Sequence, residues 1–440
     1  MKGRKTVCTF LLCILIGVSG LMSGCGDGNT TDRFNIKTDY QYQYFQPDSA
    51  LGCNVTEDED GNLYYLAGSY IYKYDIKNKK NAPLCNKANC LHDTEKDPAR
   101  YKECNAFFPY RNTESFSGIA YENGYIYLVD PGFYGNGNNT RIIRISKDGS
   151  EREILHTFSS QYMNFILHRG YFYYEDEQYD KNNHQHLCIK RYPLEKRGKE
   201  ETIWTFPAGE NGYGIQDIKA YGNHLYFNAS GDLNNGKEYY SKYFSYNIQD
   251  QKMTEIKPVA YKNSIIFNLM FFNGKVLYYS QNEDRLKDKY NVDIYECNLD
   301  GTGTRKTGIT MEVGCDMYSD GRYFITSNDN LLSMSAALKK VKNKQRKAEY
   351  KVYDSKYHLV DTYSEELKDD DLAKDGYSCY YAPIGIGGMS FCVVHKNDSG
   401  TAELYGGDKG QIGRLKGEVF KRDKLASISR SPAASYYLKN

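Results

Sequence analysis

Net charge is almost absent from this sequence. The 440 residues include 57 lysines and arginines and 56 aspartates and glutamates, which leaves a formal net charge of +1. A chain this close to neutrality gives no electrostatic reason to expect nucleic acid or an acidic membrane face as a partner. Its mean hydropathy of −0.71 excludes a protein with several membrane spans.

Sequence motifs of the common enzyme classes are also missing. There is no Gly-x-Ser-x-Gly elbow, P-loop, dinucleotide fingerprint or His-Glu-x-x-His helix. Carboxylates are plentiful, but no pattern marks a catalytic pair. The acidic stretch Asp58-Glu59-Asp60-Gly61-Asn62 lacks the rest of an EF-hand loop, so it is interpreted as a polar turn. These absences favour a non-catalytic role.

Tyrosine dominates the aromatic residues, with 44 copies against a single tryptophan. Many of the tyrosines fall in a short phrase, Gly-x-(apolar)-Tyr, which recurs in full or weakened form. Its seven glycines are Gly61, Gly124, Gly170, Gly222, Gly274, Gly321 and Gly388. Successive glycines are 63, 46, 52, 52, 47 and 67 residues apart. A period near 50 residues is typical of repeat architectures.

The phrase predicts a turn followed by a strand. Gly supplies the positive φ that closes a hairpin, and Tyr and β-branched residues fill a pleated surface. Two copies end in an Asp-Gly hairpin signal, at Asp148-Gly149 and Asp300-Gly301. Each unit is therefore predicted to be a blade of four antiparallel strands. Because one blade cannot bury both of its faces, the units are expected to close into an all-β propeller. Counting phrases gives seven blades, with six or eight as alternatives, in a protein expected to be a monomer.

Residues 1–24 have the features of an export signal. Three basic residues precede an apolar run that is too short for a membrane span. The sequence Leu21-Met22-Ser23-Gly24-Cys25 then resembles a bacterial lipobox, with Met where Leu is commoner. The resemblance implies cleavage before Cys25, diacylglycerol on its sulfur and a location on the outer face of a bacterial cell membrane. The alternative is an ordinary secretory signal with a chance cysteine.

The rest of the chain is predicted to form one main domain. Residues 25–38 have the composition of a flexible tether, and residues 39–421 are assigned to the propeller. Insertions are expected at residues 85–109, which carry Cys and His, and at residues 331–348, a basic stretch interpreted as a solvated loop rather than a polyanion site. A strand at residues 40–45 is expected to close the ring, and residues 422–440 to form a C-terminal tail with little periodicity and a loose end.

The first insertion holds the one cluster of residues with distinctive chemistry. Its members are Cys85, Cys90, His92 and Cys104. Three thiolates and one imidazole are the right ligand types and number for tetrahedral Zn²⁺, although the spacing departs from that of common zinc modules. In an exported protein, two of the cysteines could instead form a disulfide, with the third paired to Cys53. Metal, disulfide and neither all remain open, and the expected role is structural.

A catalytic zinc would need an open coordination position and a nearby general base. Asp93 and Glu95 are the local candidates for such a base.

The same residues carry a family resemblance. Pro83-Leu84-Cys85, Asn89-Cys90-Leu91-His92 and Cys104-Asn105-Ala106 stand behind a lipobox and among the tyrosine-rich repeats. In this the chain resembles a family of exported lipoproteins of clostridia and related Gram-positive anaerobes, which are predicted propellers of unassigned function. The repeats are also similar to the blades of the periplasmic propeller of the Tol system, a likeness that implies a fold and no activity.

These features predict a membrane-anchored binding or scaffolding lipoprotein whose ring faces recognise a protein or a cell-surface or environmental glycan. The alternative is a carbohydrate-active hydrolase or lyase with a carboxylate site in the propeller funnel. A third hypothesis is a metal-handling lipoprotein that uses the Cys/His insertion.

Overall fold

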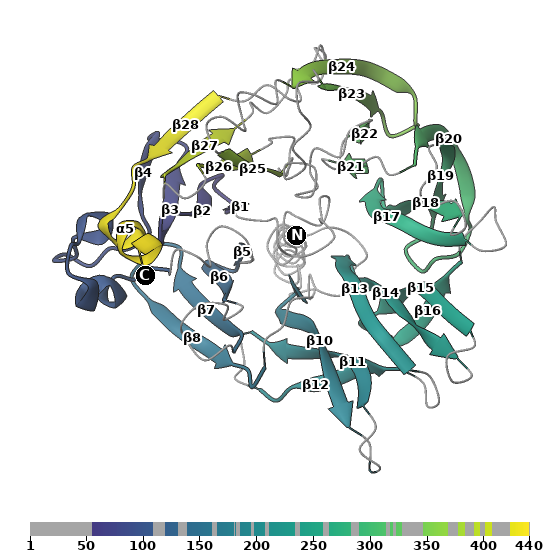
Figure 1. Cartoon of the computed structure of the whole chain (residues 1–440), viewed down its shortest axis with the longest axis horizontal. Coiled ribbons are helices and arrows are strands. Elements are labelled where there is room, and N and C mark those ends of the chain that lie inside the picture. Colours follow the sequence, from purple (N-terminus) through teal and green to yellow (C-terminus); the bar gives the residue numbers. More distant parts are fainter. Residues whose placement is uncertain are drawn as a thin grey trace, which may run out of the picture.

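The chain forms a ring of small β-sheets. The computed structural model describes residues 55–108, 119–130, 139–160, 165–179, 181, 185–194, 198–206, 211–233, 238–257, 264–282, 290–313, 317–319, 323–327, 346–367, 377–382, 391–396, 401–406 and 423–439. Within these ranges there are seven sheets, each of four antiparallel strands. Figure 1 shows the sheets arranged in chain order around a common axis. The predicted all-β class and the propeller of four-stranded antiparallel blades are confirmed.

The first four blades in chain order have the following strands. Blade one contains β1 (Val55–Glu57), β2 (Leu63–Ala67), β3 (Tyr70–Asp75) and β4 (Lys80–Pro83). Blade two contains β5 (Ile119–Glu122), β6 (Tyr125–Asp130), β7 (Arg141–Ser146) and β8 (Arg152–Thr157). Blade three contains β9 (Phe165–His168), β10 (Tyr171–Tyr179), β11 (Gln185–Pro193) and β12 (Glu201–Thr205). Blade four contains β13 (Asn211–Tyr221), β14 (His224–Leu233), β15 (Glu238–Asn247) and β16 (Lys252–Ile256).

The remaining blades repeat this pattern. Blade five contains β17 (Ser264–Phe272), β18 (Lys275–Asn282), β19 (Asn291–Cys297) and β20 (Arg305–Glu312). Blade six contains β21 (Met317–Ser319), β22 (Phe324–Ser327), β23 (Arg346–Tyr353) and β24 (Leu359–Leu367). Blade seven contains β25 (Tyr377–Ala382), β26 (Phe391–Lys396), β27 (Thr401–Gly406) and β28 (Asp423–Ile428). The first strand of a blade lies toward the axis and the fourth at the rim, as β5 and β8 show in Figure 1.

The repeated phrase is the hairpin between the first two strands of a blade. In blades two and five the loop is two residues long, because Glu122 pairs with Tyr125 and Phe272 with Lys275. Both loops are Asn-Gly pairs with positive φ at each residue, for example 47° at Asn123 and 85° at Gly124. Two positive φ values define a type I′ turn, whose twist matches that of the strands it joins.

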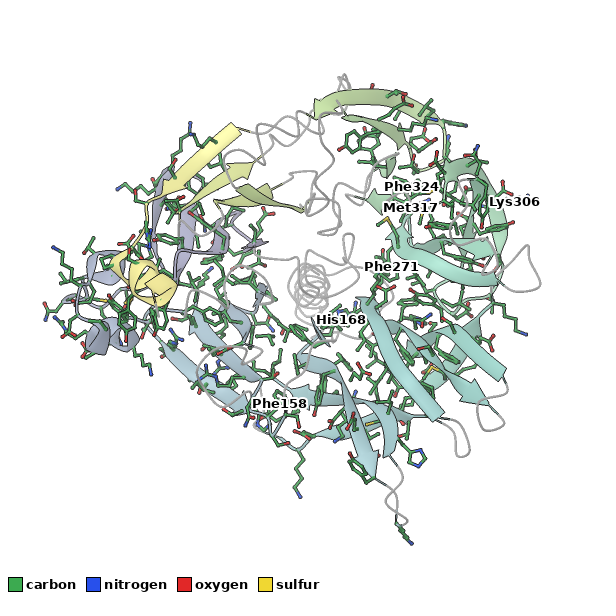
Figure 2. The ribbon with its side chains drawn as sticks, in the orientation of Figure 1. Phe158, His168, Phe271, Lys306, Met317 and Phe324 are labelled. Carbon is green, nitrogen blue, oxygen red and sulfur yellow. The ribbon has the colours of Figure 1, made fainter. Side chains whose placement is uncertain are left out.

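Aromatic side chains fill the spaces between neighbouring blades (Figure 2). Phe158, which follows the last strand of blade two, packs on Phe172 and Tyr174 of blade three, with ring centroids 5.2 and 5.0 Å apart. Phe271 of blade five stacks on Tyr221 of blade four at 5.1 Å. Each blade therefore buries its faces against its neighbours rather than within itself.

The tyrosine of the phrase adds a polar contact between blades. Its clearest case is Tyr226 of β14, which is fully buried and donates its hydroxyl to the Leu299 carbonyl oxygen of blade five at 2.7 Å. Tyr64 of β2, in the phrase of blade one, donates its hydroxyl to Asp58 at 2.8 Å, and the same oxygen lies 3.3 Å from the Lys147 carbonyl oxygen of blade two. Both carbonyl groups directly precede an Asp-Gly pair in the sequence. The phrase of one blade thus contacts the Asp-Gly turn of the next.

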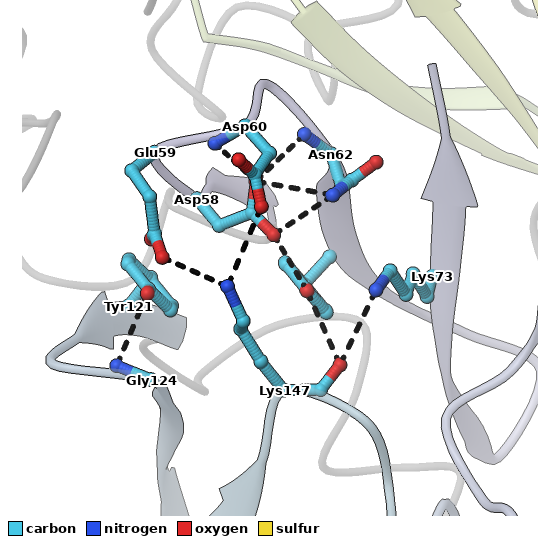
Figure 3. A network of polar contacts seen from close by, with 9 residues as sticks. Asp58, Glu59, Asp60, Asn62, Lys73, Tyr121, Gly124 and Lys147 are labelled. Carbon is cyan, nitrogen blue, oxygen red and sulfur yellow. Dashed lines mark hydrogen bonds and ion pairs between the residues drawn. The ribbon is translucent and has the colours of Figure 1, made fainter. Parts of the chain in front are cut away.

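The acidic turn at residues 58–62 also joins blade one to blade two (Figure 3). The Asp58 carboxylate accepts hydrogen bonds from the amides of Asp60 and Asn62, each at 2.9 Å, so it serves the turn itself, as the sequence predicts. Lys147 of blade two donates to Glu59 at 2.8 Å. Burial alone would raise the pKa of Glu59, but hydrogen bonds from Lys147 and Tyr121 and the positive charge of Lys147 together outweigh it and lower the pKa to about 2.

The C-terminal segment differs from its prediction. Instead of a loose tail at residues 422–440, β28 completes the last sheet and a helix, α5 (Pro432–Lys439), follows it. The prediction was wrong because β28 is far along the chain from β27 and, of its residues 424–428 whose burial is described, Ile428 alone is buried, so its sequence shows little strand period. Among the described residues, no helix has both the length and the apolar character to cross a bilayer.

Other predicted segments fall partly or wholly outside the described residues. β23 begins at Arg346, so residues 346–348 belong to a strand rather than to the predicted basic insertion, whose other residues are not described. The predicted signal segment, tether and closing strand at residues 40–45 also lie outside the described residues.

The Glu59–Lys147 pair predicts a pH-dependent contribution to stability. Because the pKa of Glu59 in the fold lies below its ordinary value of 4.5, the pair stabilises the protein above about pH 4.5 and loses this effect as the pH falls toward 2. Both side chains are more than a third exposed, which limits the interaction to about 0.2–1 kcal/mol. A double-mutant cycle of Glu59→Gln and Lys147→Met, measured by urea unfolding, should show this coupling near pH 6.

The same cycle repeated well below pH 2 is the control, since Glu59 is then largely protonated in the folded protein as well. The coupling should shrink toward zero there. An equal coupling at both pH values would mean that packing of the two side chains, and not their charges, joins the blades at this point.

Candidate metal centre

The Cys/His insertion begins directly after β4 and returns to the same sheet. Two 3-10 turns form within it, η4 (His92–Thr94) and η5 (Pro98–Glu103). η5 begins as a cap predicts: the Asp97 carboxylate accepts from the Ala99 amide at 3.0 Å, and a proline occupies the first position. The chain then runs beside β3, where the Ala106 carbonyl oxygen accepts from the Ile71 amide at 2.8 Å.

This path brings the four predicted side chains together. The ligand atoms of Cys85, Cys90, His92 and Cys104 all lie within 4.8 Å of one another. Cys104 is buried, and the other three are half-buried. The Cys104 sulfur lies 3.7 Å from Nδ1 of His92. His92 has a φ of 52°, a conformation that non-glycine residues adopt rarely and that often accompanies functional sites.

The three cysteines of the cluster are free thiols, as are Cys188 and Cys297 elsewhere in the described residues. A disulfide would require two sulfur atoms at about 2.05 Å. Cys53, the suggested partner for the third cysteine, lies outside the described residues, so that pairing stays untested.

Backbone amides are directed at all three sulfur atoms. The sulfur of Cys90 accepts from the His92 amide at 3.4 Å. The Lys87 amide bonds to the Cys85 sulfur, and the Ala106 amide bonds to the Cys104 sulfur. In each case the donor is two residues after the cysteine. Such hydrogen bonds stabilise the charged form of the acceptor, so this backbone favours thiolates.

The pKa values of the thiols reflect their crowding. Burial raises the pKa of the Cys104 thiol, and the neighbouring Cys85 and Cys90 thiols raise it further. For Cys85, burial alone would raise the pKa, but amide bonds from Lys87 and Asn105 and contacts with the other two thiols lower it below its ordinary value. A cation between the sulfur atoms would favour the thiolate form of all three.

The separations of the four ligand atoms are compatible with zinc. With Zn–S near 2.3 Å and Zn–N near 2.0 Å, ligand atoms of a tetrahedral site lie roughly 3.5–3.8 Å apart. The separation of the Cys104 sulfur and Nδ1 of His92 is in this range. Four protein ligands would leave no open position, which is the arrangement of structural rather than catalytic sites.

A buried hydroxyl beside the cluster supports this fit. Tyr70 is fully buried, and its hydroxyl has no hydrogen-bond partner among the described residues. Burial raises its pKa, and among nearby groups Cys104 adds most to that rise, with Cys90 also contributing. A metal-bound thiolate would offer this hydroxyl an acceptor, because hydrogen bonds from outer groups commonly stabilise ligating atoms.

The local carboxylates are engaged in structure rather than directed at the cluster. Asp93 accepts a hydrogen bond from the Tyr72 hydroxyl at 2.9 Å. Glu95 accepts from the amides of Lys96 and Asp97 at 2.9 and 3.0 Å. Neither carboxylate is therefore arranged as the general base that a catalytic zinc would need.

Blade two supports the insertion from the other side. The Asn105 side-chain amide donates to the carbonyl oxygens of Gly149 and Ser150 at 2.9 and 3.1 Å. Arg152 of β8 donates to the Asn105 carbonyl oxygen at 2.9 Å. Gly149 itself touches the backbone at Cys85. The sequence signals the four ligands and an Asp-Gly hairpin at 148–149, but nothing in it places that hairpin against the cluster. Cys25, the predicted lipidation site, lies outside the described residues.

Comparisons with known proteins show similarity only at the level of distant structures. No family model and no curated protein matches this chain. Porphyromonas gingivalis dipeptidyl peptidase 4 is 11% identical, with a TM-score of 0.46, over 88% of this chain and 54% of that one, so this chain spans about half of its length. An oligogalacturonate lyase in complex with manganese is 9% identical, with a TM-score of 0.44, over 81% and 86%. The Niastella koreensis GH74 enzyme is 11% identical, with a TM-score of 0.41, over 86% and 55%.

The contact between Gly149 and Cys85 predicts a steric requirement for glycine. Gly149 has a φ of +76°, and a Cβ there would lie 2.7 Å from both the Cys85 nitrogen and the Leu84 carbonyl carbon. Gly149→Ala should lower the free energy of unfolding by about 2–5 kcal/mol, because a backbone clash adds to the cost of positive φ. Urea unfolding followed by circular dichroism measures this loss.

Gly124→Ala is the matched control. Gly124 has a φ of +85°, but a Cβ there would meet nothing within 4 Å. This variant should lose only about 1–2 kcal/mol, the cost of positive φ alone. Equal losses in the two variants would show that the contact of blade two with the insertion is not tight.

Proposed function

We propose that this protein is a lipoprotein on the outer face of a bacterial cell membrane, anchored through Cys25, whose propeller binds or scaffolds a partner. The observation that carries the proposal is the ring of repeated blades, each with its first strand toward a common axis (Figure 1). Such a ring leaves two faces formed by loops, which is where proteins of this architecture present recognition surfaces. The lipobox-like sequence before Cys25 supports the anchor.

Buried charged side chains in the described residues lie at a contact between blades rather than in a catalytic arrangement. Lys219 of blade four, almost fully buried, pairs with Asp217 at 2.9 Å and donates to the Leu269 carbonyl oxygen of blade five at 2.8 Å. The Tyr243 hydroxyl donates to the same aspartate. These groups join adjacent blades, so their charges stabilise the ring.

The proposed partner is a protein or a cell-surface or environmental glycan. The chain has 44 tyrosines, and many of them are buried between blades. Tyr179, at the end of β10, is instead 60% exposed. An exposed tyrosine offers a flat apolar face and a hydroxyl, which suits contact with a protein or a sugar ring.

We further propose that Cys85, Cys90, His92 and Cys104 hold one structural Zn²⁺. Three observations support this: four ligand atoms within 4.8 Å, amides directed at all three sulfur atoms, and the buried Tyr70 hydroxyl without a partner among the described residues. The ion would order an insertion whose first turn, η4, buries no residue of its own.

The anchor and the binding role are tested together in bacteria that process lipoproteins. The wild-type protein should sediment with membranes, whereas Cys25→Ala should appear in the soluble or secreted fraction, because a diacylglycerol anchor is lost. The released variant, applied to a panel of cell-wall and plant polysaccharides, should bind at least one without changing it. Tyr179→Ala should weaken that binding by about tenfold, and Leu359→Ala, at another exposed apolar residue, should not.

Two results would count against this function. If Cys25→Ala still sediments with membranes, Cys25 is not the anchor. Reducing sugar or unsaturated product, released by native but not by heat-denatured protein, would replace the binding role with a hydrolase or lyase.

The zinc proposal predicts a stoichiometric metal. Protein purified under reducing conditions should contain about one equivalent of zinc, and Cys90→Ser should contain much less, because three ligands remain. Cys188→Ser is the control, since Cys188 is a buried free thiol in β11 away from the cluster, and should keep its zinc. Protein without zinc, whose cluster thiols also resist alkylation, would instead indicate a disulfide.

A further inference from the structure

Closure of the ring depends on contacts other than shared strands. Every described sheet is built from four strands that follow one another in the chain, so no strand from one terminus completes the sheet of the other. At the junction between the last and first blades, β26 lies against β1 and β2. The two ends of the ring must therefore be held together by side-chain contacts and by segments that cross this junction.

The segment that crosses it is α5. Ser431 caps this helix, with its hydroxyl oxygen accepting from the Ala434 amide at 3.0 Å, and Pro432 occupies the first helical position. The same hydroxyl donates to the Gly68 carbonyl oxygen, in the β2–β3 turn of blade one, at 2.8 Å. Ala433 and Ala434 are fully buried. α5 thus follows the last strand of blade seven but docks on blade one, as Figure 1 also shows.

Much of the docking surface for α5 is the Cys/His insertion. α5 contacts both η4 and η5. Tyr436 packs edge-on against Tyr101 of η5 at 6.2 Å, and Tyr437 stacks on Phe107 at 6.0 Å. Ala433 and Tyr437 of α5 belong to the same apolar cluster as Cys85, Cys90 and Cys104. The helix therefore packs on the element that contains the four candidate ligands.

The insertion also packs against blade two, where Asn105 donates to the Gly149 carbonyl oxygen and Gly149 lies close to the backbone of Cys85. One element thus touches the first blade, the second blade and the helix that ends the chain. The second half of the insertion buries Tyr101, Ala106 and Phe107, whereas η4 in its first half buries no residue. A metal ion held by Cys85, Cys90, His92 and Cys104 would cross-link this part of the insertion.

We propose that Zn²⁺ at the Cys/His cluster controls the docking of α5 and thereby closes the ring between its last and first blades. The inference rests on the proposed zinc centre and adds a conformational role to it. Metal binding orders the 85–108 segment, and the ordered segment presents Tyr101 and Phe107 to the helix. By thermodynamic linkage, docking of α5 must in turn strengthen metal binding.

The experiment is hydrogen exchange of the full-length protein, with zinc bound and after removal by a chelator and buffer exchange. Zinc removal should speed amide exchange in peptides covering residues 85–108 and 423–439 by about tenfold or more, while blades three to five change little. Zinc added back should restore protection, and magnesium should not, because thiolate sites select soft metals. Using wild-type protein avoids variants that fail to fold.

A variant tests the linkage in the other direction. Tyr437→Ala removes a docking ring without touching a ligand. It should lower zinc affinity, measured by competition with a chromophoric chelator, by about fivefold or more. Leu359→Ala, at an exposed apolar residue of blade six, is the control and should leave zinc affinity unchanged.

The possible results separate the two proposals. Zinc bound at one equivalent, with exchange in residues 423–439 insensitive to its removal, would overturn the closure role and leave the zinc centre standing. Exchange that rises equally in all blades would also overturn it, because the metal would then stabilise the whole fold. A protein that binds no zinc under reducing conditions would overturn both.

Discussion

Neither face of a four-stranded blade in this protein can be shielded by the blade itself, and the rest of the structure follows from that constraint. Phe158 is buried against blade three, and Tyr226 against blade five. A linear row of such blades would leave one face exposed at each end. Closing the row into a ring removes both exposed faces, at the cost of one junction between parts of the chain that are far apart in sequence.

The constraint also explains why tyrosine, rather than leucine, fills the repeats. A ring between two blades buries apolar area, but its hydroxyl can reach the far side of the interface. Tyr226 uses that reach to bond the Leu299 carbonyl oxygen, and Gly301, two residues on, has a φ of +79° and lies against Ile256 of the preceding blade. Gly149 stands in the same relation to Leu84 and Cys85. Two motifs that look unrelated in the sequence, Gly-x-(apolar)-Tyr in one blade and Asp-Gly in the next, therefore contact each other in the fold.

The fold could be predicted because its determinants are local and repeated. A glycine with positive φ, followed by alternating apolar residues, specifies a hairpin whatever surrounds it, as at Gly124. The four ligands were likewise recognisable by type and proximity. What could not be predicted lies in contacts between distant segments: Gly149 against Cys85, Asn105 on blade two, and α5 on the insertion. Ser431-Pro432 carries a readable helix start, yet no local pattern says that this helix belongs to blade one.

The choice between metal and disulfide at the cluster turns on what the backbone is arranged to hold. Three amides, each two residues beyond its cysteine, are directed at three sulfur atoms. In a disulfide, two of those sulfur atoms would be only weak hydrogen-bond acceptors, and the third cysteine would remain an unpaired thiol. Three thiolates would use every amide, but three negative charges within 4.8 Å repel one another strongly in a half-buried site. A divalent cation removes that repulsion and employs the imidazole as well. His92 takes a rare backbone conformation, and its Nδ1 makes only a long hydrogen bond, 3.7 Å, with the Cys104 sulfur, whereas a cation would bind both of these atoms.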